Sequence, residues 1–322
     1  MILAKKLIYS IAAQRSKQLK IVFVPEGFSS EQNYIQICKD FIVDLQGHYP
    51  FNFLINNDLI EIYSLFPDIE STPSGSLNHS ILETEINNFQ IEVNRDIVSS
   101  IIENSYFNDS PGEAIRLSDQ IHNGEVEKSL NLCLVIVLLP KMGSEFPYGI
   151  AQEFPASSDD YFFIATSVDN LWYQIVLRTI CRIIGLGDEF YAGDGIVSSP
   201  NEFEGTYIDT FFPNLLYLES NPKTINIQDS KWKKYYSNIQ SSLIVNDNAE
   251  VNSIYSYMSE DVEAWVGGGS FEKKIFRSYG DCLLSYEINN ELRPLRNSRK
   301  VLCRLCESYF LKIARNMFLG ED

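Results

Sequence analysis

The segment 170–190, NLWYQIVLRTICRIIGLGDEF, decides how this chain is organised. Residues 170–184 repeat apolar side chains at helical spacing, and Gly185 follows them as a residue that commonly ends helices. Just before the helix, Tyr161 to Ala165 has the short apolar character of a buried strand. The segment therefore predicts a strand followed by a helix, which is the repeating unit of α/β folds.

Similar units are predicted on both sides of this segment. Glu31 follows Ser29 and Ser30, residues that favour a helix start. The patterns predict strands over Leu19–Val24, Leu59–Phe66 and Leu132–Leu139, helices over Glu31–Leu45, Ile81–Asn104, Ala114–Asn123, Ser253–Val262 and Arg299–Phe318, and loops over Lys141–Asp160 and beyond the helix that Gly185 ends. This alternation predicts the α/β class.

Composition narrows the possible partners. The chain has 322 residues, of which 45% are apolar, enough for a substantial core. Lys and Arg number 26 against 43 Asp and Glu, a formal charge of -17, which repels nucleic-acid phosphates and anionic lipid. The longest apolar stretch, Leu130–Pro140, is shorter than the roughly 20 residues of a membrane span. We expect an acidic, soluble, cytoplasmic protein, since residues 1–20 form no clear signal peptide.

Three of the six cysteines, Cys282, Cys303 and Cys306, lie close together near the C-terminus. They permit a metal site, a disulfide, or three ordinary thiols. One CxxC pair with a single further cysteine is one ligand short of a four-coordinate zinc site, so ordinary thiols are the favoured interpretation. The histidines are His48, His79 and His122, none in a metal-ligand pair, and we expect no metal or other cofactor.

Several short motifs occur in a characteristic order along most of the chain. They are IVFVPEGFSS at 21–30, YPF at 49–51, the Ser74-Gly75 turn, GLGDEF at 185–190, Pro213-Asn214, KWK at 231–233, AWVGGGSF at 264–271, Asp281-Cys282 and LCRLC at 302–306. In this order they resemble the M64 (IgA-peptidase-like) family of zinc endopeptidases. The resemblance implies a metzincin-like zinc-peptidase architecture, a mixed sheet with helices on its faces. It implies one such domain over 1–322, with residues 1–18 as an N-terminal extension and the family's accessory N-terminal domain absent.

The resemblance also locates a zinc site that has lost its ligands. The family carries HExxH on the helix before its GLxDE stretch, because residues four apart share a helical face. Here the corresponding positions hold Leu177, Arg178 and Cys181. Leu177 has no donor atom, Cys181 supplies at most one ligand, and Arg178 places a positive charge where the family has its general base.

Two further family features are altered. Leu284 stands where the resemblance implies the methionine of the turn beneath the metal, and Val266 stands where it implies an acidic residue before the glycines. Asp188 and Glu189 remain, and the resemblance implies an acidic residue near the metal here; a cap or an ion pair is the structural alternative. We predict that Arg178 or Arg182 pairs with one of these carboxylates, since a lone buried charge is costly.

These observations predict a catalytically inactive M64-like pseudopeptidase that binds a peptide or protein partner, with a hetero-oligomer as one form of that binding. Zinc peptidases hold extended peptides along an edge strand, a capacity that does not require the metal. The alternatives are a hydrolase with non-zinc chemistry at Cys181 and a structural subunit of a larger assembly. The residues expected to line the binding site are Arg178, Arg182, Asp188, Glu189, Val266 and Leu284.

Overall fold

The structure is a computed structural model, and it describes much of the chain. The described residues are 3–9, 18–67, 85–87, 90–94, 131–142, 151–154, 162–169, 172–189, 197–236, 241–246, 264–278, 282–285 and 302–321. The chain divides into two compact units: unit 1 comprises Met1–Leu177, Ile288–Pro294 and Met317–Glu321, and unit 2 comprises Arg178–Glu287, Leu295–Asn316 and Asp322. That the two units together form a single peptidase-like domain over residues 1–322 stays a prediction.

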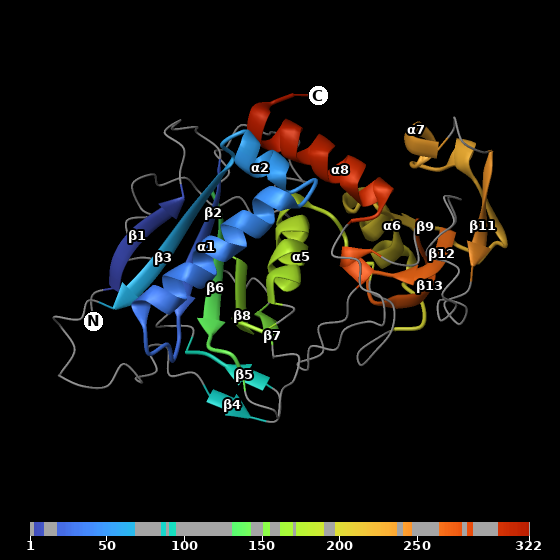
Figure 1. The fold of residues 1–322 in the computed structure, drawn as a ribbon. Coiled ribbons are helices and arrows are strands. Elements are labelled where there is room, and N and C mark those ends of the chain that lie inside the picture. The colour runs from blue at the N-terminus through green and yellow to red at the C-terminus, as the bar shows by residue number, and fades with distance from the viewer. Residues whose placement is uncertain are drawn as a thin grey trace. The chain divides into compact units, whose positions relative to one another are not determined.

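Unit 1 contains a six-stranded mixed sheet in the order β1-β3-β2-β6-β8-β7 (Figure 1). The four central strands are parallel, and both edge strands run antiparallel to their neighbours. Parallel strands are usually covered on both faces, which explains the apolar runs at residues 21–24 in β2 and 132–139 in β6. The α/β class and the mixed sheet are thus confirmed. The strands are β1 (Leu3–Tyr9), β2 (Gln18–Pro25), β3 (Ile60–Pro67), β6 (Asn131–Leu139), β7 (Ala151–Phe154) and β8 (Phe162–Ser167).

Two helices pack on this sheet through aromatic side chains. Helix α1 begins after Ser30, whose hydroxyl accepts a hydrogen bond from the Asn33 N–H, as its sequence predicts. Phe41 of α1 contacts Phe23 of β2 with ring centroids 5.5 Å apart, and Trp172 of α5 contacts both rings. No helix in the described part of the chain is both long and apolar enough to cross a bilayer. The helices of this region are α1 (Glu31–Gly47), α2 (Asn52–Asn56) and α5 (Trp172–Ile184), the last of which continues into unit 2.

Unit 2 is built on a five-stranded mixed sheet in the order β10-β11-β12-β13-β9. Ile208, Leu215 and Ile275 form an apolar cluster between helix α6 and this sheet. Its elements are α6 (Glu202–Phe211), β9 (Leu215–Tyr217), β10 (Thr224–Asn226), η3 (Ile227–Asp229), α7 (Lys233–Tyr236), β11 (Ser242–Asn246), β12 (Ala264–Gly268), β13 (Phe271–Arg277), η6 (Leu283–Ser285) and α8 (Arg304–Ala314), and the chain continues from α8 into η7 (Arg315–Leu319).

Three sequence-based assignments need correction. The helix predicted over Ile81–Asn104 is wrong at the residues that the structure describes there, because β4 (Glu85–Asn87) and β5 (Gln90–Glu92) form an antiparallel pair. Strand pairing, which local periodicity does not register, decides the structure there. The loop predicted over Lys141–Asp160 contains β7, and the one predicted beyond α5 contains α6, β9 and β10. All of these elements are short, although α6 begins with a complete capping box of Asn201 and Glu204. The helices predicted at Ala114–Asn123 and Ser253–Val262 lie outside the described residues.

Candidate functional site

The candidate site lies in unit 2, where the chain leaves helix α5. Gly185 has a φ of 103°, a left-handed backbone that favours glycine, and ends the helix as its sequence predicts. The Leu186 N–H then donates to the Cys181 carbonyl at 3.0 Å. We call residues 185–189 the GLGDE segment. It carries the two acidic residues Asp188 and Glu189.

The GLGDE segment is fixed by hydrogen bonds from three other parts of unit 2. The buried Asn214 side chain accepts from the Gly187 N–H and donates to the Gly187 carbonyl, both at 2.8 Å. The Glu189 N–H donates to the Leu284 carbonyl at 2.9 Å, and the Gly269 N–H donates to the Asp188 carbonyl at 2.8 Å. The two acidic side chains are therefore held by a rigid backbone.

Asp188 lies between two arginines of α5. Arg178 approaches one carboxylate oxygen through Nε at 3.0 Å and Nη2 at 2.9 Å, and Arg182 approaches the other through Nε at 3.3 Å. The arginines are four residues apart, so both point from one helical face. Arg178 is buried, whereas Arg182 is partly exposed. The predicted ion pair is confirmed for Asp188 with both arginines.

This donor set does not fit the catalytic zinc ion that the family resemblance would place here. Guanidinium groups have no acceptor lone pair, and two of them beside one carboxylate leave a net positive charge that opposes a dication. Leu177 is buried and offers only hydrocarbon. Asp188 and Cys181 remain as donors, against the three protein ligands usual in catalytic zinc sites.

Cys181 is also a poor nucleophile. Its side chain is fully buried, and burial raises the pKa of the thiol well above its usual value. The nearby Asp188 charge raises this pKa further, while Arg178 lowers it. Since the thiolate is the reactive species, the neutral buried thiol is unreactive.

We expect iodoacetamide to leave Cys181 unmodified in the native protein under reducing conditions. Cys133, which is only partly buried in unit 1, should react measurably faster and serves as the internal comparison. Both should react once urea unfolds the chain. Peptide mass mapping measures each site, and rapid native labelling of Cys181 would restore it as a candidate nucleophile.

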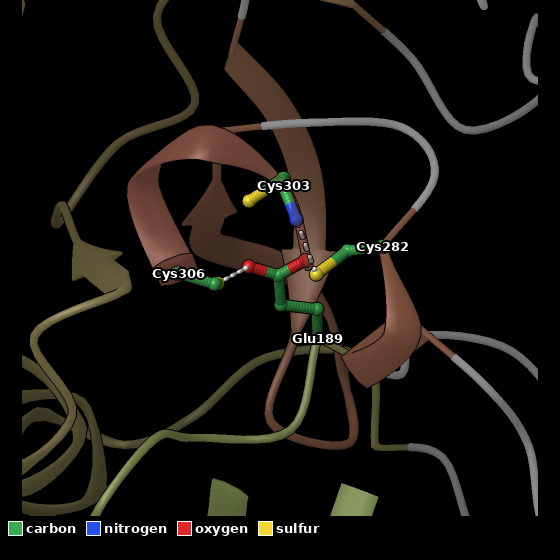
Figure 2. Close-up of side chains that lie close together, drawn as sticks. All are labelled: Glu189, Cys282, Cys303 and Cys306. Carbon is green, nitrogen blue, oxygen red and sulfur yellow. Dashed lines mark hydrogen bonds between the residues drawn. The ribbon is translucent and has the colours of Figure 1, made fainter. Parts of the chain in front are cut away.

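The other retained acid, Glu189, lies among the three C-terminal cysteines (Figure 2). The donor atoms of Glu189, Cys282, Cys303 and Cys306 all lie within 4.8 Å of one another, and all four residues are buried. The Cys306 thiol donates to Glu189 Oε1 at 3.0 Å, and the Cys303 N–H donates to Cys282 Sγ at 3.3 Å. We call these four residues the Cys3Glu cluster.

Proton affinities in the Cys3Glu cluster are strongly shifted. Burial, and then the neighbouring Cys303, raise the pKa of Glu189 to about 8. Burial likewise raises the pKa of Cys282 and of Cys306. Hydrogen bonds from those two thiols lower the pKa of Cys303. Glu189, Cys282 and Cys306 therefore hold their protons tightly, whereas Cys303 is the sulfur most easily ionised.

Val266 and Leu284 stand at the two other positions where the sequence departs from the family pattern. Each contributes to the site through its backbone carbonyl, which accepts a hydrogen bond. The Val266 carbonyl accepts from Arg277 Nη1 at 2.9 Å, and Leu284 holds the Glu189 N–H as described above. Sequence reasoning missed two supporting residues, the buried Asn214 and Arg277. It also separated Glu189 from the cysteines. The Pro213-Asn214 motif was the one available signal for Asn214, but nothing in it indicates a contact with Gly187.

Four of the six expected binding residues thus fall into two groups. Arg178, Arg182 and Asp188 form the ion-pair centre, and Glu189 joins the Cys3Glu cluster.

No protein-family model matches the chain, and no curated protein shows significant sequence similarity to it. The kinship with M64 peptidases therefore rests on the ordered motifs alone and stays a prediction.

Proposed function

We propose that this chain is a non-catalytic protein with a metzincin-like peptidase architecture, which acts by binding an extended peptide segment of a protein partner. The observation that carries the proposal is the pairing of Asp188 with Arg178 and Arg182. These residues belong to the helix and acidic segment in which M64-like enzymes would hold zinc.

The ion pair is a stable replacement for a metal rather than an empty site. Arg178 is buried and makes two contacts with one oxygen of Asp188, so its charge has a counter-charge within hydrogen-bond distance. A zinc ion would have to displace both arginines from the same carboxylate. Zinc-dependent hydrolysis at this place is accordingly disfavoured by the side chains that are present.

Binding of a peptide is supported by the edge of the sheet in unit 1. Strand β7 is the last strand of the six-stranded sheet and runs antiparallel to β8, with Gln152 opposite Ala165. Edge strands carry backbone groups that pair with an added strand. The Gln152 side chain accepts the Ile91 N–H at 2.8 Å, which ties β7 to the β4–β5 pair and fixes its position. An extended peptide antiparallel or parallel to β7 would continue the sheet.

The alternative of non-zinc hydrolysis at Cys181 has no supporting geometry, since that thiol is buried and protonated. A fixed role within a larger assembly uses the same binding capacity with a permanent partner. The proposal therefore covers transient and permanent partners that present an extended segment.

A peptide-binding assay with a hydrolysis control tests this function. The folded full chain is used to select binders from a library of random peptides displayed on phage, and selected peptides are titrated by fluorescence anisotropy. We expect saturable binding that N-methylation of alternate peptide amides weakens by at least about tenfold, because each lost backbone hydrogen bond weakens strand addition. Denatured casein incubated with the protein and added zinc should stay intact by mass spectrometry.

Two results would overturn the proposal. Cleavage of casein that depends on the added protein would show that the site is catalytic. Failure to select any peptide whose affinity depends on its backbone amides would remove strand addition as the mode of binding. An intact casein profile together with amide-dependent binding supports both halves of the proposal.

A further inference from the structure

The Cys3Glu cluster has the donor set of a closed zinc site. Zinc in proteins prefers four tetrahedral ligands drawn from thiolate, imidazole and carboxylate. At a Zn–S distance of about 2.3 Å, tetrahedral sulfurs lie about 3.8 Å apart. The four donor atoms here already lie within 4.8 Å of one another. Small side-chain movements are enough to bring them to the distances that the ion requires.

The local backbone suits thiolate ligands. Cys303 and Cys306 form a C-x2-C pair at the start of α8, with Cys303 as the residue that caps the helix. Helix N-termini stabilise thiolates through the helix dipole and free N–H groups. The Cys303 N–H already donates to Cys282 Sγ at 3.3 Å. Cys282 is thus oriented by the same helix start that supplies the other two sulfurs.

The fourth ligand comes from the GLGDE segment. Glu189 is fully buried, its N–H is held by Leu284, and its Oε1 accepts from Asn214 Nδ2 at 3.3 Å and from the Cys306 thiol at 3.0 Å. Asn214 therefore orients the carboxylate in the way that outer hydrogen bonds orient metal ligands. Burying the ionised carboxylate of Glu189 among three buried thiols is costly in free energy unless a cation or a proton neutralises its charge.

We propose that Cys282, Cys303, Cys306 and Glu189 bind a structural zinc ion that links the GLGDE segment, η6 and the start of α8. The four protein ligands leave no open coordination position, as in structural rather than catalytic sites. The ion would join segments that are far apart in sequence, since Glu189 and Cys306 are separated by 117 positions. This inference does not depend on the proposed function, and it differs from the sequence-based expectation of no metal.

Metal content and cobalt spectroscopy test the proposal on the full chain. The protein is purified under reducing conditions without chelators, and we expect one zinc per chain by elemental analysis. Replacement by Co²⁺ should give sulfur-to-metal charge-transfer absorption and the intense visible bands of tetrahedral cobalt. Removal of the metal with a strong chelator should lower the thermal midpoint by several degrees, and added zinc should restore it.

Ligand variants and matched controls locate the ion. Cys306→Ser and Glu189→Gln should each weaken zinc binding by more than about 100-fold, the upper end of the loss caused by removing an outer-shell partner. Cys133→Ser and Glu272→Gln remove the same kinds of group from partly buried and exposed positions, and should retain full zinc. Should a ligand variant fail to fold, the native chain decides: zinc should protect Cys282, Cys303 and Cys306 from alkylation.

Three outcomes would overturn the proposal. The first is a chain that stays free of zinc when purified with zinc present and shows no cobalt spectrum. The second is a disulfide among the three cysteines, seen as the loss of two hydrogens in the mass of the reduced-condition preparation. The third is unchanged zinc content in both ligand variants. None of these results alters the peptide-binding assay, so failures of the two proposals are distinguishable.

Discussion

Replacing Asp188 with alanine should lower the free energy of unfolding by about 3 kcal/mol or more. The change leaves the guanidinium of Arg178 buried without its counter-charge, and this loss is larger than the interaction energy of the pair itself. Arg182 is partly exposed, so water can solvate it and its share of the loss is small. Urea denaturation followed by circular dichroism measures the change.

A double substitution distinguishes the loss of the ion pair from a non-specific loss of stability. Arg178→Leu combined with Asp188→Ala removes both charges, and we expect it to recover more than half of the stability lost in Asp188→Ala, since apolar replacements of buried pairs are often tolerated. Glu272→Ala removes a carboxylate from an exposed position of β13 and should change stability by less than about 0.5 kcal/mol. An equal loss in the single and double variants would contradict a buried ion pair.

The central strands and longest helices were predictable because each carries its own strong signal. β2 and β6 contain the apolar runs at residues 21–24 and 132–139, and α5 repeats apolar residues at helical spacing until Gly185 ends it. β7 and α6 are short, and their places in the fold depend on pairing with β8 and packing on β9. Such tertiary contacts leave little trace in a local pattern, which is why both fell within predicted loops.

The candidate site likewise has one part that the local sequence predicted and one part that depends on tertiary contacts. The short distance along the chain between α5 and the GLGDE segment predicted that Arg178 or Arg182 pairs with Asp188 or Glu189, but the sequence did not say that both arginines meet Asp188. The Cys3Glu cluster needs the chain to bring Glu189 next to cysteines more than ninety positions away. The sequence showed three candidate thiols and one acid, but not that they meet.

Replacing Asn214 with alanine should lower the free energy of unfolding by about 3 kcal/mol. Its buried side chain satisfies both the N–H and the carbonyl of Gly187, and each buried polar group left unpaired costs about 1–3 kcal/mol. Asn214 is fully buried, so bulk solvent does not contact these two groups in the native protein. Thermal and urea unfolding of the variant measure the loss.

Asn201→Ala is the matched control, since it removes the same side chain from the exposed start of α6 and should cost only about 1 kcal/mol. Asn214→Asp is more specific still: it keeps an acceptor for the Gly187 N–H, loses the donor to the Gly187 carbonyl, and puts a second carboxyl beside Glu189. We expect it to be destabilised as well, because an ionised carboxylate has no hydrogen to donate to the Gly187 carbonyl. A loss in Asn214→Ala no larger than in Asn201→Ala would mean that the GLGDE segment is held by its other hydrogen bonds, and that Asn214 is not what positions Asp188 and Glu189.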